Sequence, residues 1–580
     1  MAKIETIITD HLDVWSSAIK QRNSQGRGSS KKQELYGIQK LRELILELAV
    51  RGLLVPQDPN NEPASVLIEK IAEERKQLVK EKKIKKPRNL LEVAEEEHYF
   101  NLPKSWVWVR LANIGYDWGQ KVPDKTFTYI DVGSINKERG IIESPNQLEA
   151  SEAPSRARKI VKKGTVIYST VRPYLLNIAV IDRQILPEPI ASTAFAIIHP
   201  FEGISADYVY RYLRSPSFIK YVESCQTGVA YPAINDRQFF TGLIPLPPAN
   251  EQKRIVEKVD ELMALCDQLE ERQENNIAAH QQLVEVLLAA LTQATDAEAF
   301  QQAWTRLAAN FKALFTTENS IDQLKQTLLQ LAVMGKLVPQ DPNDEPASVL
   351  LEKIAAEKEN LIKEGKLKKQ KRPPKIDMKS APFVVPSSWE WKNLSSLFAL
   401  VTDGDHQAPP KSSDGIPFLV IGNLNSGEVQ FDNCRYVPKN YFENLDWTKK
   451  PVKGDLLYTV TGSYGIPIKV TVKEKFCVQR HVAILKSTSS TPIDYLSYLV
   501  CSTYALQYAQ DVATGIAQKT VPLSSLRTMP IAVPPENEQK RIVEKVDQLF
   551  AICDQLKEKI RTAEETQLQL ADALTNQAIQ

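Results

Sequence analysis

Two stretches of the chain repeat apolar residues at spacings of three and four, which is the pattern of one helix face. The apolar positions are Ile255, Val259, Leu262, Cys266 and Leu269 in the first stretch and Ile542, Val546, Leu549, Cys553 and Leu556 in the second. Two prolines precede each stretch, and Asn250 and Asn537 follow them at positions suited to capping a helix. The spacing predicts two long helices, each with an apolar seam that needs a helical partner.

The first of these helices is predicted to run to about residue 294, because no proline or glycine interrupts it. At about 1.5 Å per residue it would form a rod of roughly 65 Å. Its seam turns polar in the middle, at Gln273, Asn276 and His280, and then returns as Leu283, Leu287 and Leu291. A polar break of this kind either favours one register of helix pairing or marks a gap filled by solvent.

The chain contains one unit twice. Residues 41–71 return almost unchanged as residues 324–354, and residues 250–269 return as residues 537–556. The apolar positions of residues 41–71 also recur at helical spacing, which makes the two copies of this block the natural partners of the long helices. Such a repeated scaffold is either an antiparallel coiled coil that only stiffens the protein or, as we expect, a spacer between two binding domains.

Between the repeated blocks lie two variable domains, residues 99–248 and 383–535, which share a skeleton but little sequence. Each opens with a proline followed by a Trp-x-Trp pair, and matched runs such as KKGTVIYST and VKGDLLYTV predict strands. A Thr-Gly loop follows in both domains, at residues 227–228 and 514–515. The predicted fold class is α+β, with two globular mixed α/β domains joined by long antiparallel helices in a pseudo-twofold arrangement.

The predicted boundaries follow from these patterns. They are residues 1–98 for an N-terminal helical repeat region, 99–248 for the first variable domain, 249–382 for a central helical spacer, 383–535 for the second variable domain and 536–580 for a C-terminal helix. A basic run precedes each variable domain, at residues 80–88 and 363–375. Such a run is either a solvated linker or a track along phosphates, and the sequence leaves both open.

Charge is almost balanced over the chain, with 73 Lys and Arg against 71 Asp and Glu, so a surface for nucleic acid must be local. The sequence has no leader of basic and then apolar residues and no apolar run near about 18 residues, which predicts a cytoplasmic protein. The cysteines form no C-x-x-C pair and the histidines no His-x-x-x-His pair, so we expect no metal site. Cys266 and Cys553 lie on the helical seams and are predicted to be buried.

Polar side chains near the predicted loops differ between the two variable domains. Arg, Lys, Asn and Gln are suited to bind base edges, with Ser, Tyr and His in polar positions nearby. The candidates are Arg156, Arg158, Lys163, Arg172, Tyr174, Tyr231, Asn235 and Arg237 in the first domain and His406, Ser463, Tyr464, Arg480, His481, Gln518 and Lys519 in the second. A single surface arginine is usually only solvated, so the prediction depends on the set.

Catalytic motifs are missing from the sequence. It contains no phosphate-binding or dinucleotide-binding glycine motif and no motif for amine methylation. Glu251 with Lys253, and Glu538 with Lys540, resemble half of a nuclease site, but both pairs fall in the first turn of a predicted helix. A charge pair at a helix terminus is the simpler interpretation. We therefore expect no catalytic residue and no cofactor in this chain.

The doubled VPQDPN blocks, the doubled NEQKRIVEKVD blocks and the two domains that begin Pro-x-x-Trp-x-Trp resemble the specificity subunits of Type I restriction-modification systems. In that family each variable domain is a target-recognition domain that reads one half of a split DNA site. The resemblance implies a subunit that binds double-stranded DNA, recognises a bipartite target and directs methylation and restriction by its partners.

The same resemblance implies which partners these are. They are two modification (methyltransferase) subunits and the restriction/translocase subunits, which would bind S-adenosylmethionine, ATP and magnesium. The chain itself would not be an enzyme, and its N-terminal Leu-rich block would pair with the C-terminal helix. From the residues alone, a helical scaffold with two peptide- or ligand-binding domains remains the alternative.

Overall fold

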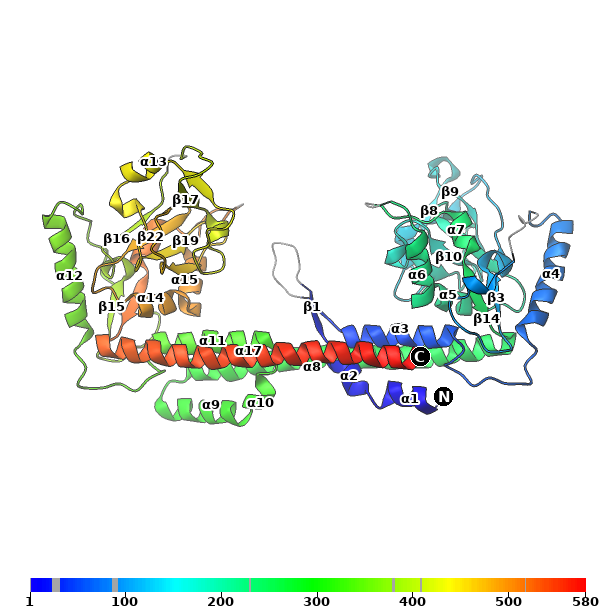
Figure 1. The fold of residues 1–580 in the computed structure, drawn as a ribbon, viewed down its shortest axis with the longest axis horizontal. Coiled ribbons are helices and arrows are strands. Elements are labelled where there is room, and N and C mark those ends of the chain that lie inside the picture. The colour runs from blue at the N-terminus through cyan, green and yellow to red at the C-terminus, as the bar shows by residue number, and fades with distance from the viewer. Residues whose placement is uncertain are drawn as a thin grey trace. The chain divides into compact units, whose positions relative to one another are not determined.

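The computed structural model of the chain describes residues 2–22, 32–85, 92–228, 231–377, 381–406, 409–516 and 518–579. The chain packs as two compact units, one made of residues 1–276 with 563–580 and the other of residues 277–562. Each unit combines a sheet-rich variable domain with several helices (Figure 1).

The first unit contains short helices and parts of two long helices, α8 and α17. Its helices are α1 (Ala2–Thr9), α2 (Leu12–Ser17), α3 (Tyr36–Val50), α4 (Ala64–Lys80), α5 (Ala206–Leu213), α6 (Pro216–Cys225), α7 (Asp236–Thr241), the first part of α8 (Ala249–Gln293) and the last part of α17 (Glu536–Ile579). Its strands are β1 (Lys20–Arg22), β2 (Lys32–Glu34), β3 (Val107–Arg110), β4 (Gly115–Tyr116), β5 (Phe127–Ile130), β6 (Ile135–Asn136), β7 (Ile141–Ile142), β8 (Asn146–Leu148), β9 (Ala157–Ile160), β10 (Val166–Ser169), β11 (Ile178–Val180), β12 (Pro189–Ser192), β13 (Phe195–Pro200) and β14 (Leu243–Leu246).

The second unit repeats this organisation. Its helices are the last part of α8, α9 (Ala297–Ala309), α10 (Phe311–Leu314), α11 (Glu318–Val333), α12 (Ala347–Lys363), α13 (Lys439–Asn444), α14 (Ile493–Val500), α15 (Thr503–Val512), α16 (Leu523–Thr528) and the first part of α17. Its strands are β15 (Glu390–Asn393), β16 (Leu400–Asp403), β17 (Ile416–Leu419), β18 (Arg435–Val437), β19 (Leu456–Thr459), β20 (Pro467–Lys469), β21 (Cys477–Val478), β22 (Val482–Lys486) and β23 (Pro530–Val533).

Helix α3 packs antiparallel to α8 in the first unit. Arg42 in α3 contacts Glu270 of α8, whereas Gln57, beyond the end of α3, contacts Glu251 at the start of α8. The last turns of α17 complete this bundle, with residues such as Leu574 in its apolar core. The predicted seam is confirmed, because Ile255, Val259, Leu262 and Cys266 are all buried there.

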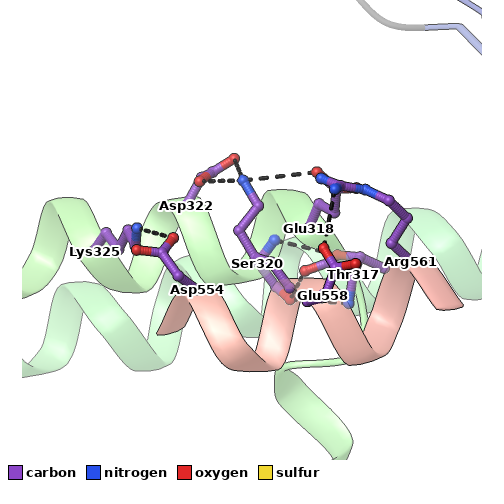
Figure 2. Close-up of polar contacts among 9 residues, drawn as sticks. Thr317, Glu318, Ser320, Asp322, Lys325, Asp554, Glu558 and Arg561 are labelled. Atoms are coloured by element: carbon purple, nitrogen blue, oxygen red, sulfur yellow. Dashed lines mark hydrogen bonds and ion pairs between the residues drawn. The ribbon is translucent and has the colours of Figure 1, made fainter. Parts of the chain in front are cut away.

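Helix α11 packs antiparallel to α17 in the second unit, and four ion pairs connect them (Figure 2). Their N–O distances are 2.5 Å for Lys325 and Asp554, 2.9 Å for Lys557 and Asp322, 3.6 Å for Lys557 and Glu318, and 3.3 Å for Arg561 and Glu318. The first pair corresponds to Arg42 and Asp267 in the first unit (2.7 Å), at the equivalent positions of the repeat. The other three pairs have no such counterpart, because the residues of α8 that correspond to Lys557 and Arg561 are Glu270 and Glu274.

The two variable domains contain corresponding sheets, one antiparallel and one mixed in each domain. In the first, β10 pairs antiparallel with β13, and in the second, β19 pairs antiparallel with β22 in the same way. A second sheet in each contains one parallel pair, β5 with β12 and β17 with β21. The strand orders are β11-β10-β13-β4 and β8-β5-β12-β9 in the first domain and β16-β22-β19-β20 and β18-β17-β21 in the second. The expected α+β fold with long helices is confirmed.

A buried polar network joins the repeated blocks to the variable domain in each unit, and we call it the repeat junction. Glu538 accepts hydrogen bonds from Gln340 Nε2 (2.5 Å) and Trp389 Nε1 (2.9 Å), and Glu251 accepts one from Gln57 Nε2 (2.6 Å). The two glutamates are about 1% exposed. Burial raises the pKa of both carboxyls, and the hydrogen bonds from these donors offset only part of that increase. Glu251 and Glu538 lie in the first helical turn as predicted, but the predicted charge pairs were wrong, because Lys253 and Lys540 pair with Glu257 and Glu536 instead.

Two further predictions about the long helices were wrong. Helices α8 and α17 begin at Ala249 and Glu536, so Asn250 and Asn537 lie in the first turn and do not precede it as caps. After the polar break, α8 buries Leu291 as predicted, but it buries Val284 and Leu288 in place of Leu283, which is 49% exposed, and Leu287, which is half-buried. A straight helix has 3.6 residues per turn, so a strict seven-residue repeat drifts around its surface.

No helix in the described part of the chain combines the length and apolar character needed to cross a bilayer.

Candidate nucleic-acid interface

In the first variable domain, the segment that follows β10 is held against two later segments. Ile234 N donates to Thr170 O (3.0 Å), and Arg172 N donates to Pro232 O (2.8 Å). Thr227 and Ala233 exchange two backbone hydrogen bonds of 2.9 Å each. These bonds bring residues 170–174, 227–228 and 231–235 together at the end of β10, and we call this region the loop edge.

The second variable domain builds its loop edge with the same backbone bonds. Val521 N donates to Val460 O (2.8 Å), and Gly462 N donates to Lys519 O (3.0 Å). Thr514 and Thr520 exchange two bonds of 2.8 Å each. The two domains therefore share one loop frame although their sequences differ there.

The Thr-Gly loop predicted in both domains is explained by this frame. Gly228 has a φ of +93° and Gly515 a φ of +101°, a conformation that disfavours any residue with a Cβ atom. A Cβ at Gly515 would also lie 2.5 Å from Gln518 O, and one at Gly228 would lie 2.9 Å from Tyr231 O. Glycine is thus required for the tight turn at both loop edges.

Several predicted residues of the first domain meet at its loop edge. The Arg172 guanidinium lies 4.7 Å from the ring centroid of Tyr231, and Tyr174 and Tyr231 are 53% and 67% exposed. Arg156 lies next to them, because Thr193 N donates to Arg156 O (2.8 Å) and Thr170 N donates to Ala194 O (2.9 Å). This edge therefore presents cationic and aromatic side chains to solvent.

Two other predicted residues of this domain lie at the start of α7, beside the loop edge. The Asn235 side chain caps α7 by accepting from Gln238 N (2.9 Å), so its amide oxygen already has a partner. Arg237 follows in the first turn of α7 and is exposed.

Arg158 and Lys163 are placed differently. Arg158 lies on β9, half-buried, and its guanidinium donates to Ala157 O (2.8 Å). Lys163 lies in the turn before β10, at the opposite end of that strand from Arg172. Its neighbour Lys162 lies 3.6 Å from the ring centroid of Trp118. The structure does not bring Lys163 to the loop edge.

The second domain gathers most of its predicted residues at its loop edge. Ser463, Gln518 and Lys519 are exposed and Tyr464 is half-buried beside them. Val460 N donates to His481 O (3.0 Å), which places His481 and the exposed Arg480 at the same edge. Burial, with Arg480 nearby, lowers the pKa of His481, so that imidazole favours its neutral form.

His406 reaches this region from another segment. Its Nε2 lies 2.9 Å from Asp403 Oδ2, and Asp403 also binds Lys449 Nζ at 3.1 Å. Asp405 pairs with Gln479 in a parallel bridge, which links this segment to the residue before Arg480.

One exposed residue at the loop edge was missed. Ile516, after Gly515, has a fully exposed side chain. The sequence contained a signal for it, because Thr-Gly-Ile-Ala at 514–517 matches Thr-Gly-Val-Ala at 227–230. This short motif is shared, whereas the residues that follow it, Tyr231-Pro232 and Gln518-Lys519, differ.

The remaining candidate chemistry is structural. The predicted burial of Cys266 and Cys553 is confirmed, and burial raises the pKa of the Cys266 thiol to about 11. Within the ranges that the structure describes, no group of three or more His, Cys, Asp or Glu side chains is arranged to hold a metal ion.

Comparison with known proteins identifies this combination of features. A family model described as "Type I restriction modification DNA specificity domain" matches residues 120–279 and 386–565, more than half of the chain. The chain belongs to the family of Type I restriction-modification specificity subunits. It is a DNA-recognition subunit, and the scaffold with peptide- or ligand-binding domains is thereby excluded.

Relatives support the assignment along the full length. The EcoAI specificity subunit of Escherichia coli is 39% identical over 99% of this chain and 100% of the relative. The EcoEI specificity subunit of Escherichia coli is 36% identical with the same coverage. A solved structure titled as a study of assembly and conformational transition of the Type I R-M system aligns with a TM-score of 0.51 and 23% identity, over 83% of this chain and 99% of that chain, and it supports the fold.

Proposed function

We propose that each variable domain reads one half of a bipartite DNA target through its loop edge. The observation that carries this proposal is the pairing of one backbone frame with two sets of side chains. Arg172, Pro232 and Tyr231 in the first domain correspond to Gly462, Lys519 and Gln518 in the second. A common frame keeps the docking geometry, and different side chains select different bases.

The chemistry of the exposed side chains suits base and phosphate recognition. Arg172 and Gln518 have the paired donors or donor and acceptor that match purine edges in the major groove. Lys519 and Arg480 are exposed cations suited to phosphate oxygens. Mapping methylated adenines in cells that carry this subunit with its partners tests the proposal. We expect one split motif with an unspecified gap, and a single continuous motif would contradict it.

We further propose that two identical modification subunits bind the repeated blocks, one to each unit. The repeat has kept exposed side chains and not only buried ones. The matched exposed pairs are Asn60 and Asn343, Glu62 and Glu345, Lys70 and Lys353, Lys253 and Lys540, and Glu257 and Glu544. Identical buried residues in the two copies are explained by a shared core. Identical exposed residues are best explained by a partner that binds both units.

Some of the matched side chains line a groove in each unit, namely Glu62 and Lys70 in the first and Lys353, Lys540 and Glu544 in the second. One groove is lined by Leu67, Lys70 and the start of α8, and the other by Leu350, Lys353 and the start of α17. Lys253 and Lys540 are exposed on the first turns of these helices. This surface is therefore the proposed docking site for the modification subunits.

Charge reversal at the two lysines tests the docking proposal. K253E and K540E should each weaken one partner site by about tenfold or more, because like charges across an interface are costly. Native mass spectrometry should show one bound modification subunit for each single variant and none for the double variant. K312E, on α10 outside the repeated blocks, is the control. Two bound subunits in the double variant would contradict the proposal.

Catalysis would then belong to the partners. The proposal assigns S-adenosylmethionine, ATP and magnesium to the modification and restriction subunits, which would act with this subunit on DNA in the cytoplasm. Support comes from the sequence, which contains no glycine motif for a nucleotide and no amine-methylation motif. The purified chain, incubated with DNA and labelled S-adenosylmethionine, should transfer no label, and transfer would contradict this assignment.

A further inference from the structure

A buried lysine lies next to the loop edge of the first variable domain. Lys159 is on β9, and its side chain is 8% exposed. Its amine donates to Phe195 O (2.6 Å) at the start of β13 and to Asp236 Oδ2 (3.0 Å) in the first turn of α7. Burying an ammonium group is costly unless it has partners of this kind. One side chain therefore connects three segments that are far apart in the sequence.

The two segments that this amine contacts are part of the loop edge or adjoin it. Phe195 follows Ala194, whose carbonyl accepts a hydrogen bond from Thr170 N (2.9 Å). Asp236 lies two residues after Ile234, whose backbone N donates to Thr170 O (3.0 Å). The buried amine is thus bonded within two residues of the backbone bonds that hold the loop edge together.

Two exposed guanidinium groups depend on where these segments lie. Arg156 directly precedes β9, and Arg237 directly follows Asp236 in α7. The capping bond of Asn235 is local, so it fixes the shape of the first turn of α7 but not the distance of that turn from β9. The bond between Lys159 and Asp236 connects the two elements. A guanidinium that binds two atoms of a base edge must be placed accurately, and such a bond supplies the support.

The second variable domain does not repeat this contact. The residue that corresponds to Asp236 is Leu523, in the first turn of α16. Among the strands that the structure describes, none corresponds to β9, because the second sheet ends at β21 where that of the first domain continues from β12 to β9. A contact needed for the common fold would be expected in both copies, as at the repeat junction. The difference favours a role in one half-site.

We propose that Lys159 is a positioning residue for base recognition by the first variable domain. Its amine sets the distance between the segments that carry Arg156 and Arg237, so that both guanidinium groups meet base edges of the same half-site. Lys159 is itself buried and acts on DNA through Asp236 and β9. This inference rests on the proposed function, because it concerns the DNA contacts of the loop edge.

The variants K159M and D236A test this proposal in the complete complex with the modification subunits. Methionine keeps the apolar stem, and the Asp236 side chain, which is 54% exposed, can bind water once the amine is gone. Each variant should lower discrimination against single base-pair changes in the first half-site by about tenfold. The second half-site and the affinity for a random duplex should not change, because phosphate contacts carry that affinity.

Two further variants complete the experiment. R172A identifies the half-site that the first domain reads. K325M removes a partly buried lysine that pairs with the exposed Asp554 between α11 and α17, and as the matched control it should leave both half-sites unchanged. The double variant K159M/D236A should lose no more discrimination than K159M alone, because both changes remove one contact.

Three results would overturn the positioning role. They are unchanged discrimination in K159M and D236A, an equal loss in both half-sites, and an equal fall in affinity for the motif and for the random duplex. If K159M does not fold, D236A decides by the same criteria. The wild-type preference for the motif over the random duplex tests the proposed function. Without that preference both proposals fail, whereas a normal preference with unchanged variants removes only the role of Lys159.

Discussion

The repeat junction and the loop edge occupy different parts of each unit. The two copies have the same side chains at the repeat junction but different side chains at the loop edge. At the junction, Gln57 with Glu251 and Gln340 with Glu538 make the same buried contact. At the loop edge the backbone bonds are the same, but Arg172 in one domain is Gly462 in the other.

This difference separates two roles within one fold. Side chains that make the same contact in both copies, as at the repeat junction, have a role in packing. A backbone that is the same in both copies but carries different side chains, as at the loop edge, has a role that differs between the copies. The junction therefore fixes each variable domain to its helices, and the loop edge is where the two targets are distinguished.

The largest expected effect comes from removing the junction indole. W389A deletes a side chain that is 5% exposed and donates to Glu538, and it should destabilise the second unit by about 3–5 kcal/mol. Hydrogen exchange of β22 and α14 amides measures this locally. W304A, which removes an indole that is 43% exposed, is the control, and an equal effect of both variants would contradict the role of the junction.

At the loop edge, single truncations should change specificity with little change in stability. R172A should reduce discrimination in one half-site by about 1–3 kcal/mol, and Q518A should do so in the other half-site. Competition binding with single base-pair changes in each half measures this. K163A, at the other end of β10, should leave both halves unchanged. If R172A relaxed both half-sites equally, the two edges would not be independent.

The ion pairs in Figure 2 predict a smaller effect on the helices. K557E places a carboxylate beside Asp322 and Glu318 and should destabilise the packing of α11 on α17 by about 1 kcal/mol. The double variant K557E/D322K should recover most of this loss in a double-mutant cycle of unfolding free energies. Additive losses would show that the pair makes no contribution.

The last expected effect is confined to alkaline pH and differs between the units. Burial lowers the pKa of Lys358 from 10.5 to about 8. Burial also lowers the pKa of Arg75, at the equivalent position of α4, but a guanidinium stays charged where an amine does not. Between pH 8 and 10.5 the unfolded chain binds more protons at Lys358, so the unfolding free energy should rise with pH in that window relative to K358M. Equal pH dependence of wild type and K358M would contradict a buried amine.

Much of this architecture was predictable because helical seams and strand runs have strong local patterns. The buried positions Ile255 and Val259 followed from spacing alone. The shift from Leu283 to Val284 did not, because it depends on how the seam resumes after a polar break. Glu251 was misread for a related reason, since its partner Gln57 is distant in sequence and only packing shows that the carboxylate is buried.

The predictions about the candidate site show the same contrast between local sequence and tertiary structure. Residue type pointed to Arg172, Tyr231, Gln518 and Lys519, and the structure places them at the loop edges. Lys163 has an equally suitable side chain but lies at the wrong end of its strand. The topology of the sheet decides at which end of a strand a loop lies, and residue type alone does not predict it.

The most direct test is to replace residues 383–535 with a second copy of residues 99–248. The repeat junctions are made by the same residue types in both units, so the inserted domain should fold on the second scaffold. Mapping of methylated adenines should then show a split target with the same half-sequence on both sides of the gap. A target with the original second half, or with both halves changed, would contradict independent reading by the two domains.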